Sequence, residues 1–118
     1  MHCAFESFPF LVTSQEPALP TITAVIRVRP GCEQQMHDQL LAVAQNARLH
    51  EPGTLDYFVS QDAKDACVFT TYERYVDQAA MDLHNNSATV AKFFEVAKPM
   101  LDGTPTVVLA TEVFSKRG

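Results

Sequence analysis

The spacing of apolar residues changes along this chain, and each change marks the boundary of a predicted element. Residues Thr21–Arg29 alternate and are rich in β-branched side chains, which predicts a strand with one apolar face made by Ile22, Ala24, Ile26 and Val28. From about Cys32 to Leu49, apolar residues recur every three or four positions, which predicts a helix with a stripe of Met36, Leu40, Val43 and Ala47. Glu51-Pro52-Gly53 ends this helix and turns the chain.

The second half of the chain repeats this change from strand to helix. Two strands are predicted over Leu55–Ser60 and Cys67–Tyr75, and their short connection favours an antiparallel hairpin. Asp77 can cap a short helix that ends near His84. Ser87 can cap another helix, running to about Lys98, with an apolar stripe of Val90, Phe93, Phe94 and Ala97. A last strand is predicted over Thr106–Phe114.

The resulting order is β-α-β-β-α-β, with the second helical region broken in two. This order predicts an α+β protein of the ferredoxin-like, split β-α-β type, with a four-stranded antiparallel sheet and helices on one face. We expect one domain over residues 21–114 and a polar tail over residues 115–118.

Residues 1–20 differ from the rest because three prolines interrupt them and no lasting period appears. They are either a disordered end or an arm that packs on its own domain or on a neighbouring subunit. Their apolar residues, which are costly to leave in water, favour the arm: Phe5, Phe8, Phe10, Leu11 and Val12.

The predicted sheet has apolar residues on both faces, although helices can cover only one. In the last strand Val107 and Leu109 lie on one face, and Val108 and Ala110 on the other. A single sheet that tolerates exposed apolar residues is one interpretation. Two sheets that face each other across a two-fold axis would bury these residues, and the pattern favours this homodimer.

Composition narrows the function classes. A chain of 118 residues with a net charge of −5 and scattered Lys and Arg lacks the basic face that nucleic acid requires. No apolar run is long enough to span a bilayer, so no membrane partner is expected. The three cysteines have no redox or zinc spacing, which is typical of reduced thiols in a cytoplasmic protein.

Candidate chemistry gathers where the third predicted strand leads into the short helix. His84 should face inward; it is either a structural group that closes the helix end or a general base. Glu73 is a carboxylate in an otherwise apolar strand, so it needs a partner; it either anchors this corner or orients His84. Tyr72 and Tyr75 alternate, so at most one shares a cavity with His84.

Aromatic side chains around this corner are core residues by default. If they line a cleft, it would suit a flat aromatic or quinone-like molecule, with walls formed by Tyr57, Tyr75, Phe93 and Phe94. No set of side chains has convincing metal-ligand spacing, and the sequence has no P-loop, dinucleotide glycine motif or nucleophile elbow.

Several short motifs, in this order, resemble the antibiotic-biosynthesis-monooxygenase domain. They are Glu51-Pro52-Gly53, Tyr57, Tyr72-Glu73-Arg74-Tyr75, Asp77-Gln-Ala-Ala80, and His84 followed by Ser87. The resemblance covers about Thr21–Phe114 and implies a dimeric α+β barrel with a cavity between each sheet and its helices. The tryptophan usual in this family is replaced by Tyr75, which argues against the haem-degrading branch.

Taken with these residues, the resemblance implies a cofactor-independent oxidoreductase: a monooxygenase that uses molecular oxygen on a small phenol, quinol or polyketide-like aromatic. His84 would be the base, assisted by Tyr72 and Glu73. Two alternatives remain: a non-catalytic binding protein for a small apolar molecule, and an isomerase or lyase of a small signalling metabolite. A phosphorylated substrate would need cations in the cavity, and the candidates are Arg27, Arg29, Arg74 and Lys92.

Overall fold

The predicted order of elements is confirmed. The computed structural model describes residues 18–117, so most of the expected arm, with Phe5 and Phe8, lies outside the described residues. The elements are β1 (Pro20–Arg27), α2 (Glu33–His50), β2 (Thr54–Gln61), β3 (Val68–Tyr75), α3 (Gln78–Asn85), α4 (Ala88–Ala97), the short 3₁₀ helix η2 (Lys98–Met100) and β4 (Thr106–Thr111).

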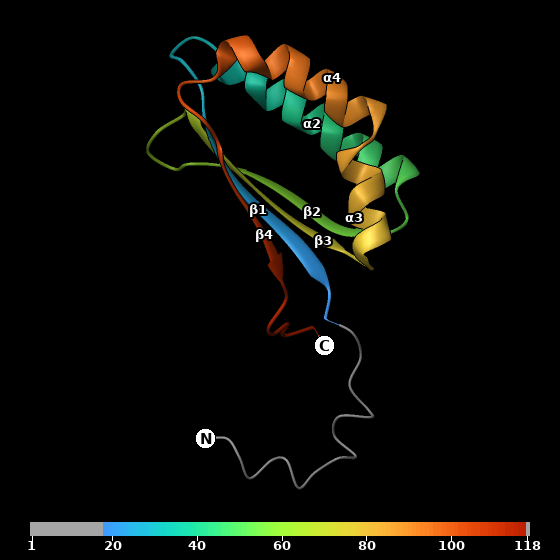
Figure 1. The fold of residues 1–118 in the computed structure, drawn as a ribbon. Helices are drawn as coiled ribbons and strands as arrows, with labels where there is room; N and C mark the ends of the chain where they lie inside the picture. The colour runs from blue at the N-terminus through green and yellow to red at the C-terminus, as the bar shows by residue number, and fades with distance from the viewer. Residues whose placement is uncertain (1–17, 118) are drawn as a thin grey trace, which may run out of the picture.

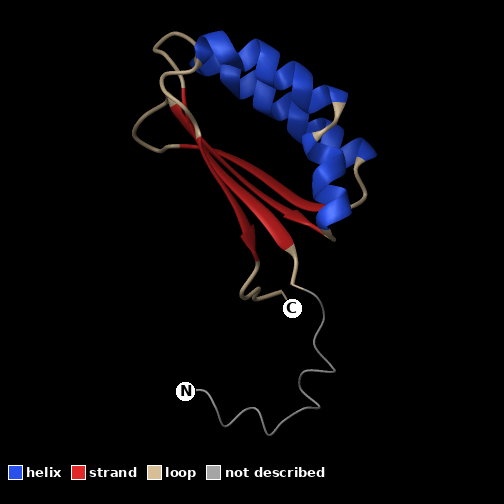
Figure 2. Ribbon diagram, in the orientation of Figure 1, coloured by secondary structure: helices blue, strands red, loops and turns tan. Residues whose placement is uncertain are grey.

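The strands form one antiparallel sheet in the order β2-β3-β1-β4, which is the ferredoxin-like arrangement. Figure 1 shows α2 and α4 side by side over one face of the sheet. The short helix α3 lies near the start of β2 and the end of β3. Within the described part of the chain, no helix lies on the other face (Figure 2).

Local chemistry fixes where the helices of the second half begin. The Asp77 carboxylate accepts a hydrogen bond from the backbone N–H of Ala80 at 2.8 Å, and α3 follows directly. The Ser87 hydroxyl accepts one from the N–H of Val90 at 3.2 Å, and α4 follows. Both residues satisfy N–H groups that have no partner within the helix, as expected of N-caps.

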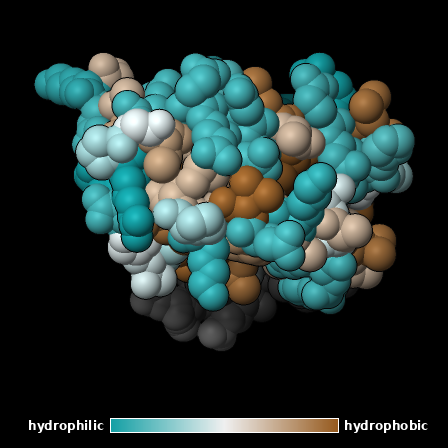
Figure 3. Space-filling model, turned by 90° about the horizontal axis from the view of Figure 1, so that it is seen from above, coloured by the Kyte–Doolittle hydropathy of each residue, from teal (hydrophilic) through white to brown (hydrophobic). Residues whose placement is uncertain are grey.

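The core lies between the sheet and α2 and α4. The four strand residues expected on one face and the four helix residues expected in the stripe of α2 are all buried. Phe69 and Met100 complete the main cluster. Seen from the helix side, the surface is mostly hydrophilic, with a few hydrophobic side chains gathered near its middle (Figure 3). The helices therefore bury their apolar stripes against the sheet.

Three details differ from the sequence prediction. The last strand ends at Thr111 rather than Phe114, because Thr111 pairs with Pro20, the first residue of β1. Beyond it the backbone N–H of Glu112 still donates to the carbonyl oxygen of Leu19, outside β1. The first strand ends at Arg27, and Val28 continues only as an isolated bridge to Leu101. Phe94 is 59% exposed and is therefore not part of the buried stripe of α4.

Candidate functional site

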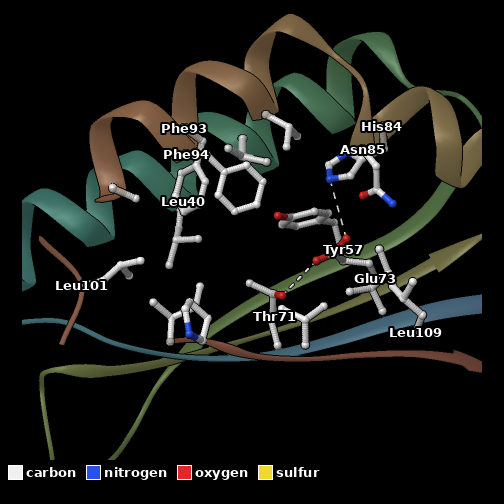
Figure 4. A pocket seen from close by; sticks show the side chains of 18 residues that line it. Leu40, Tyr57, Thr71, Glu73, His84, Asn85, Phe93, Phe94, Leu101 and Leu109 are labelled. Carbon is white, nitrogen blue, oxygen red and sulfur yellow. Dashed lines mark hydrogen bonds and ion pairs between the residues drawn. The ribbon is translucent and has the colours of Figure 1, made fainter. Parts of the chain in front are cut away.

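A cavity of about 280 Å³ lies between the sheet and the helices. Its apolar walls come from β1, α2, α4 and β4. The exposed side chains in its lining are Phe94 of α4, Val107 and Leu109 of β4, and Asn85 of α3. The cavity therefore opens between α4 and β4, with Asn85 at its rim. Its polar side chains come from β2, β3 and α3: Tyr57, Thr71, Glu73, His84 and Asn85 (Figure 4).

His84 is held at one end of this cavity by Glu51. The ring is almost fully buried, and its Nδ1 lies 2.8 Å from Oε1 of Glu51. A carboxylate only accepts hydrogen bonds, so Nδ1 carries a hydrogen and donates it. Glu51 is itself fixed, because it also accepts hydrogen bonds from Thr54 at 2.8 Å and Asn46 at 3.1 Å. In the neutral ring, Nε2 is then the atom with a free lone pair.

Glu73 lies beside this free nitrogen. Its Oε1 is 3.6 Å from Nε2 of His84, which is an ion-pair distance and too long for a hydrogen bond. Tyr75 donates its hydroxyl to Oε1 at 2.5 Å, and Thr71 donates its hydroxyl to Oε2 at 2.9 Å. Both carboxylate oxygens are thus held by neighbouring residues of β3, and the predicted proximity of Glu73 and His84 is confirmed.

Tyr57 occupies the middle of the cavity. Its ring centroid is 5.6 Å from that of His84, and its hydroxyl points into the cavity (Figure 4). Among the described residues, no hydrogen-bond partner meets this hydroxyl. Burial, together with the negative charges of Glu73 and Glu51, raises the pKa of the Tyr57 phenol well above its usual range. Tyr57 therefore offers a neutral O–H donor to a ligand.

The other predicted site residues divide into three groups. Phe93 and Phe94 line the cavity as predicted, with their ring centroids 5.5 Å apart. Tyr75 is completely buried behind Glu73 and has no surface on the cavity. Tyr72 lies on the opposite face of the sheet, where it stacks on Phe58 at 6.3 Å, so the structure does not bring it to the site.

None of the four candidate cations lines the cavity. Arg27 pairs with Asp65 at the surface, and Arg29 and Lys92 are exposed. Arg74 lies on the other face of the sheet, where it binds Asp56 at 3.0 Å and both carboxylate oxygens of Glu112.

Sequence reasoning did not identify Glu51 as a site residue. Its signal was the Glu51-Pro52-Gly53 turn, which had been interpreted as the end of the helix and as a motif of the resemblance, but not as part of a site. Within residues 18–117, no three metal-ligating side chains gather into a candidate site. In the same part of the chain, no helix combines the length and the hydropathy needed to cross a membrane.

The chain is similar to known proteins in sequence and in fold. The chain is 27% identical over 92 residues to the Bacillus subtilis (strain 168) protein named "Putative monooxygenase YcnE", covering 78% of this chain and 95% of that protein. Two crystal structures share the fold. PA3566 from Pseudomonas aeruginosa has a TM-score of 0.76 at 24% identity, over 86% of this chain and all of the other. A "putative antibiotic biosynthesis monooxygenase" from Caulobacter crescentus has a TM-score of 0.77 at 19% identity, over 83% and 92% of the two chains.

The sequence model of one family matches residues 21–96, which is more than half of the chain and includes every strand but the last. This match carries the assignment, because structural similarity at such low identity establishes the fold alone. The chain belongs to the antibiotic biosynthesis monooxygenase family.

Proposed function

We propose that this protein is a cofactor-independent monooxygenase that oxidises a small phenol or quinol with molecular oxygen. The observation that carries the proposal is the Glu51–His84 pair at the end of an apolar cavity. Glu51 holds the ring so that Nε2 is free to accept a proton, as an orienting carboxylate does for a catalytic histidine. A flat aromatic molecule would lie between Phe93 and the sheet, with its hydroxyl toward His84.

The reaction begins when Nε2 of His84 removes the phenolic proton. The electron-rich anion transfers one electron to oxygen, and the two radicals combine into a peroxide at a hydrogen-bearing ring carbon ortho or para to the phenolic oxygen. His84 returns its proton to the outer peroxide oxygen. The imidazole then removes the hydrogen on that carbon, the O–O bond breaks, and a quinone and hydroxide form. The hydroxide takes the proton from His84 and leaves as water.

This sequence balances without a flavin. One oxygen atom enters the quinone and the other enters water, and all four electrons come from the substrate. Tyr57 takes the role that the sequence suggested for Tyr72, because its unpaired hydroxyl can donate a hydrogen bond to a substrate oxygen. Glu73 stabilises the imidazolium that forms on His84, since its carboxylate lies 3.6 Å from Nε2.

Oxygen uptake with a panel of quinols tests the proposal. We expect His84→Ala to lower the rate by about 10²–10⁴-fold, the usual contribution of positioned acid–base catalysis. His50→Ala is a matched control, because His50 is exposed at the end of α2. Equal rates in wild type and His84→Ala would remove His84 from the mechanism. Ligand-dependent stabilisation without oxygen uptake would instead identify a binding protein.

Glu51 is the positioning residue in this scheme, and Glu51→Gln tests it. The amide oxygen still accepts a hydrogen bond from Nδ1 of His84. The amide N–H₂ group can instead donate to Nδ1, which allows the other tautomer of the imidazole, and the negative charge is lost. We expect kcat to fall at least about tenfold with little change in KM. Glu95→Gln, on the exposed side of α4, is the control and should match wild type. An unchanged kcat in Glu51→Gln would show that the pair is only structural.

A phosphorylated substrate for an isomerase or lyase loses support, because the four cations proposed for it lie outside the cavity lining.

A further inference from the structure

The cavity carries a negative charge that no cation within its lining balances. Among the described residues of the lining, Glu73 is the only acidic side chain and His84 the only basic one. Glu51 lies directly behind His84. Among the described residues, no Lys or Arg lines the cavity. When His84 is neutral and able to accept a proton, the Glu73 carboxylate therefore faces the ligand's polar end, and the Glu51 carboxylate lies behind the His84 ring, with no cation of the lining beside them.

Glu73 cannot move away from this position. Its side chain is 7% exposed, and both of its oxygens accept hydroxyl hydrogen bonds from its own strand. Most of the remaining lining is apolar. Apolar side chains screen a charge less than bulk water does, so its effect on a nearby ligand is stronger than that of a surface carboxylate.

We propose that the cavity admits its ligand only as an uncharged molecule, and that Glu73 sets this selectivity. Neutral phenols and quinols bind, whereas carboxylated or phosphorylated analogues and preformed phenolates are rejected. The inference rests on the proposed site but not on its chemistry, because it concerns binding alone.

The same charge distribution is compatible with making the anion inside the cavity. When a phenol gives its proton to His84, the total charge of the site does not change, because one imidazolium and one phenolate form together. The imidazolium then lies between two carboxylates and next to the phenolate. A phenolate that enters from solvent brings an extra negative charge and no such partner. Substrate therefore has to enter protonated and lose its proton within the cavity.

Two ligands of similar size separate charge from shape: 1-naphthol, which is neutral at pH 7, and 1-naphthoate, which is anionic. Their dissociation constants are measured by calorimetry without oxygen, so that no turnover intervenes. We expect naphthoate to bind at least about tenfold more weakly than naphthol. With 4-nitrophenol, which ionises near neutral pH, affinity should follow the neutral fraction as pH rises.

Three variants identify the cause. Glu73→Gln should narrow the difference between the two ligands, with circular dichroism as the check on folding. Asn85→Arg is less disruptive, because Asn85 is exposed at the rim of the cavity; it should strengthen naphthoate binding several-fold relative to naphthol binding. Asn86→Arg adds the same charge one residue further on, at an exposed position outside the lining, and should change neither ligand.

The proposal is overturned if naphthoate binds wild type as tightly as naphthol does, if naphthol does not bind, or if Asn85→Arg and Asn86→Arg act alike. These outcomes are distinct from failure of the proposed reaction. A protein that prefers naphthol but consumes no oxygen with any quinol would keep the selectivity and lose the oxygenase. A protein that oxidises quinols but binds both naphthalenes equally would do the opposite.

Discussion

Tyr75 and Tyr72 test how much a single hydroxyl contributes in this molecule. The Tyr75 hydroxyl is buried and donates to Glu73 at 2.5 Å, whereas Tyr72 is 37% exposed on the other face. Tyr75→Phe leaves a buried carboxylate oxygen without its donor, so we expect a loss of about 1.5–3 kcal/mol in the free energy of unfolding. Tyr72→Phe should change it by no more than about 0.5 kcal/mol. Urea denaturation measures both, and equal effects would contradict the role of the hydrogen bond.

The same residues predict how stability depends on alkaline pH. Burial first, and then the charge of Glu73 and the hydrogen bond to it, raise the pKa of Tyr75 above the usual value of about 10. The pKa of Tyr57 is also raised, mainly by burial. Above about pH 10 the unfolded chain therefore binds fewer protons than the folded one, and the free energy of unfolding falls as pH rises.

Phenylalanine at either position should weaken this pH dependence. Urea titrations of wild type, Tyr57→Phe and Tyr75→Phe between pH 8 and 11 measure it. A wild-type slope in both variants would show that the two phenols ionise alike in the folded and unfolded states.

For single residues, the sequence predicted which polar side chains lie in apolar surroundings, but not every side chain that contacts them. His84 and Glu73 stood out because a core does not need them, and they do lie together. Glu51 did not stand out, because it is distant in sequence from His84 and sits in an ordinary helix-ending turn. Tyr72 was grouped with His84 from proximity along the chain, although strand alternation left room on the inner face for only one of the two tyrosines.

The helices and strands were predicted more accurately than the partners of single residues, since most of the signals for an element lie within its own stretch of sequence. Alternation, helical spacing and two caps predicted every strand and helix in the described part of the chain, apart from the short η2. The errors fall at strand ends. Val113 and Phe114 favour a strand by composition, but pairing stops at Pro20, where β1 begins, and this limit is set by a partner that is distant in sequence.

Between elements, Gly53 couples the Glu51 turn to the helix that carries His84. A Cβ atom at Gly53 would lie 2.6 Å from the Cβ of Ala80 in α3, which is far inside van der Waals contact. We expect Gly53→Ala to cost about 1–3 kcal/mol in the free energy of unfolding. It should also lower oxygen uptake, because α3 must move away from the turn that holds Glu51.

A second substitution separates this clash from other effects. Ala80→Gly makes room for the new methyl group, so the double variant Gly53→Ala/Ala80→Gly should recover activity despite about 1 kcal/mol of lost helix propensity. Ala79→Gly carries the same propensity cost at an exposed position and should give no recovery. Strictly additive effects in a double-mutant cycle measured by urea denaturation would rule out contact between the two residues.

At the scale of the whole molecule, the uncovered face of the sheet predicts a second copy. Val25, Phe58 and Val108 are each between 42% and 54% exposed on this face, and Phe58 stacks on Tyr72. Apolar or aromatic side chains from all four strands thus lie on this face, beside the ion pairs of Arg74, which favours the two-fold pairing of sheets expected from the sequence. Val108→Asp should give a monomer by sedimentation velocity, whereas Leu83→Asp, on the exposed side of α3, should not.

The predicted assembly would also bear on the cavity, because β4 lines the cavity and would lie in the interface. Val107 and Leu109 form the wall at the mouth of the cavity, and Val108 between them points to the opposite face. Within the described chain β4 pairs only with β1, so a partner packed on Val108 would restrain the strand that forms this wall. We therefore expect Val108→Asp to weaken 1-naphthol binding as well as dimerisation. A milder variant, Val108→Ala, should weaken both less as the protein concentration is raised. A monomeric Val108→Asp that binds naphthol as tightly as wild type would show that each subunit forms its cavity alone.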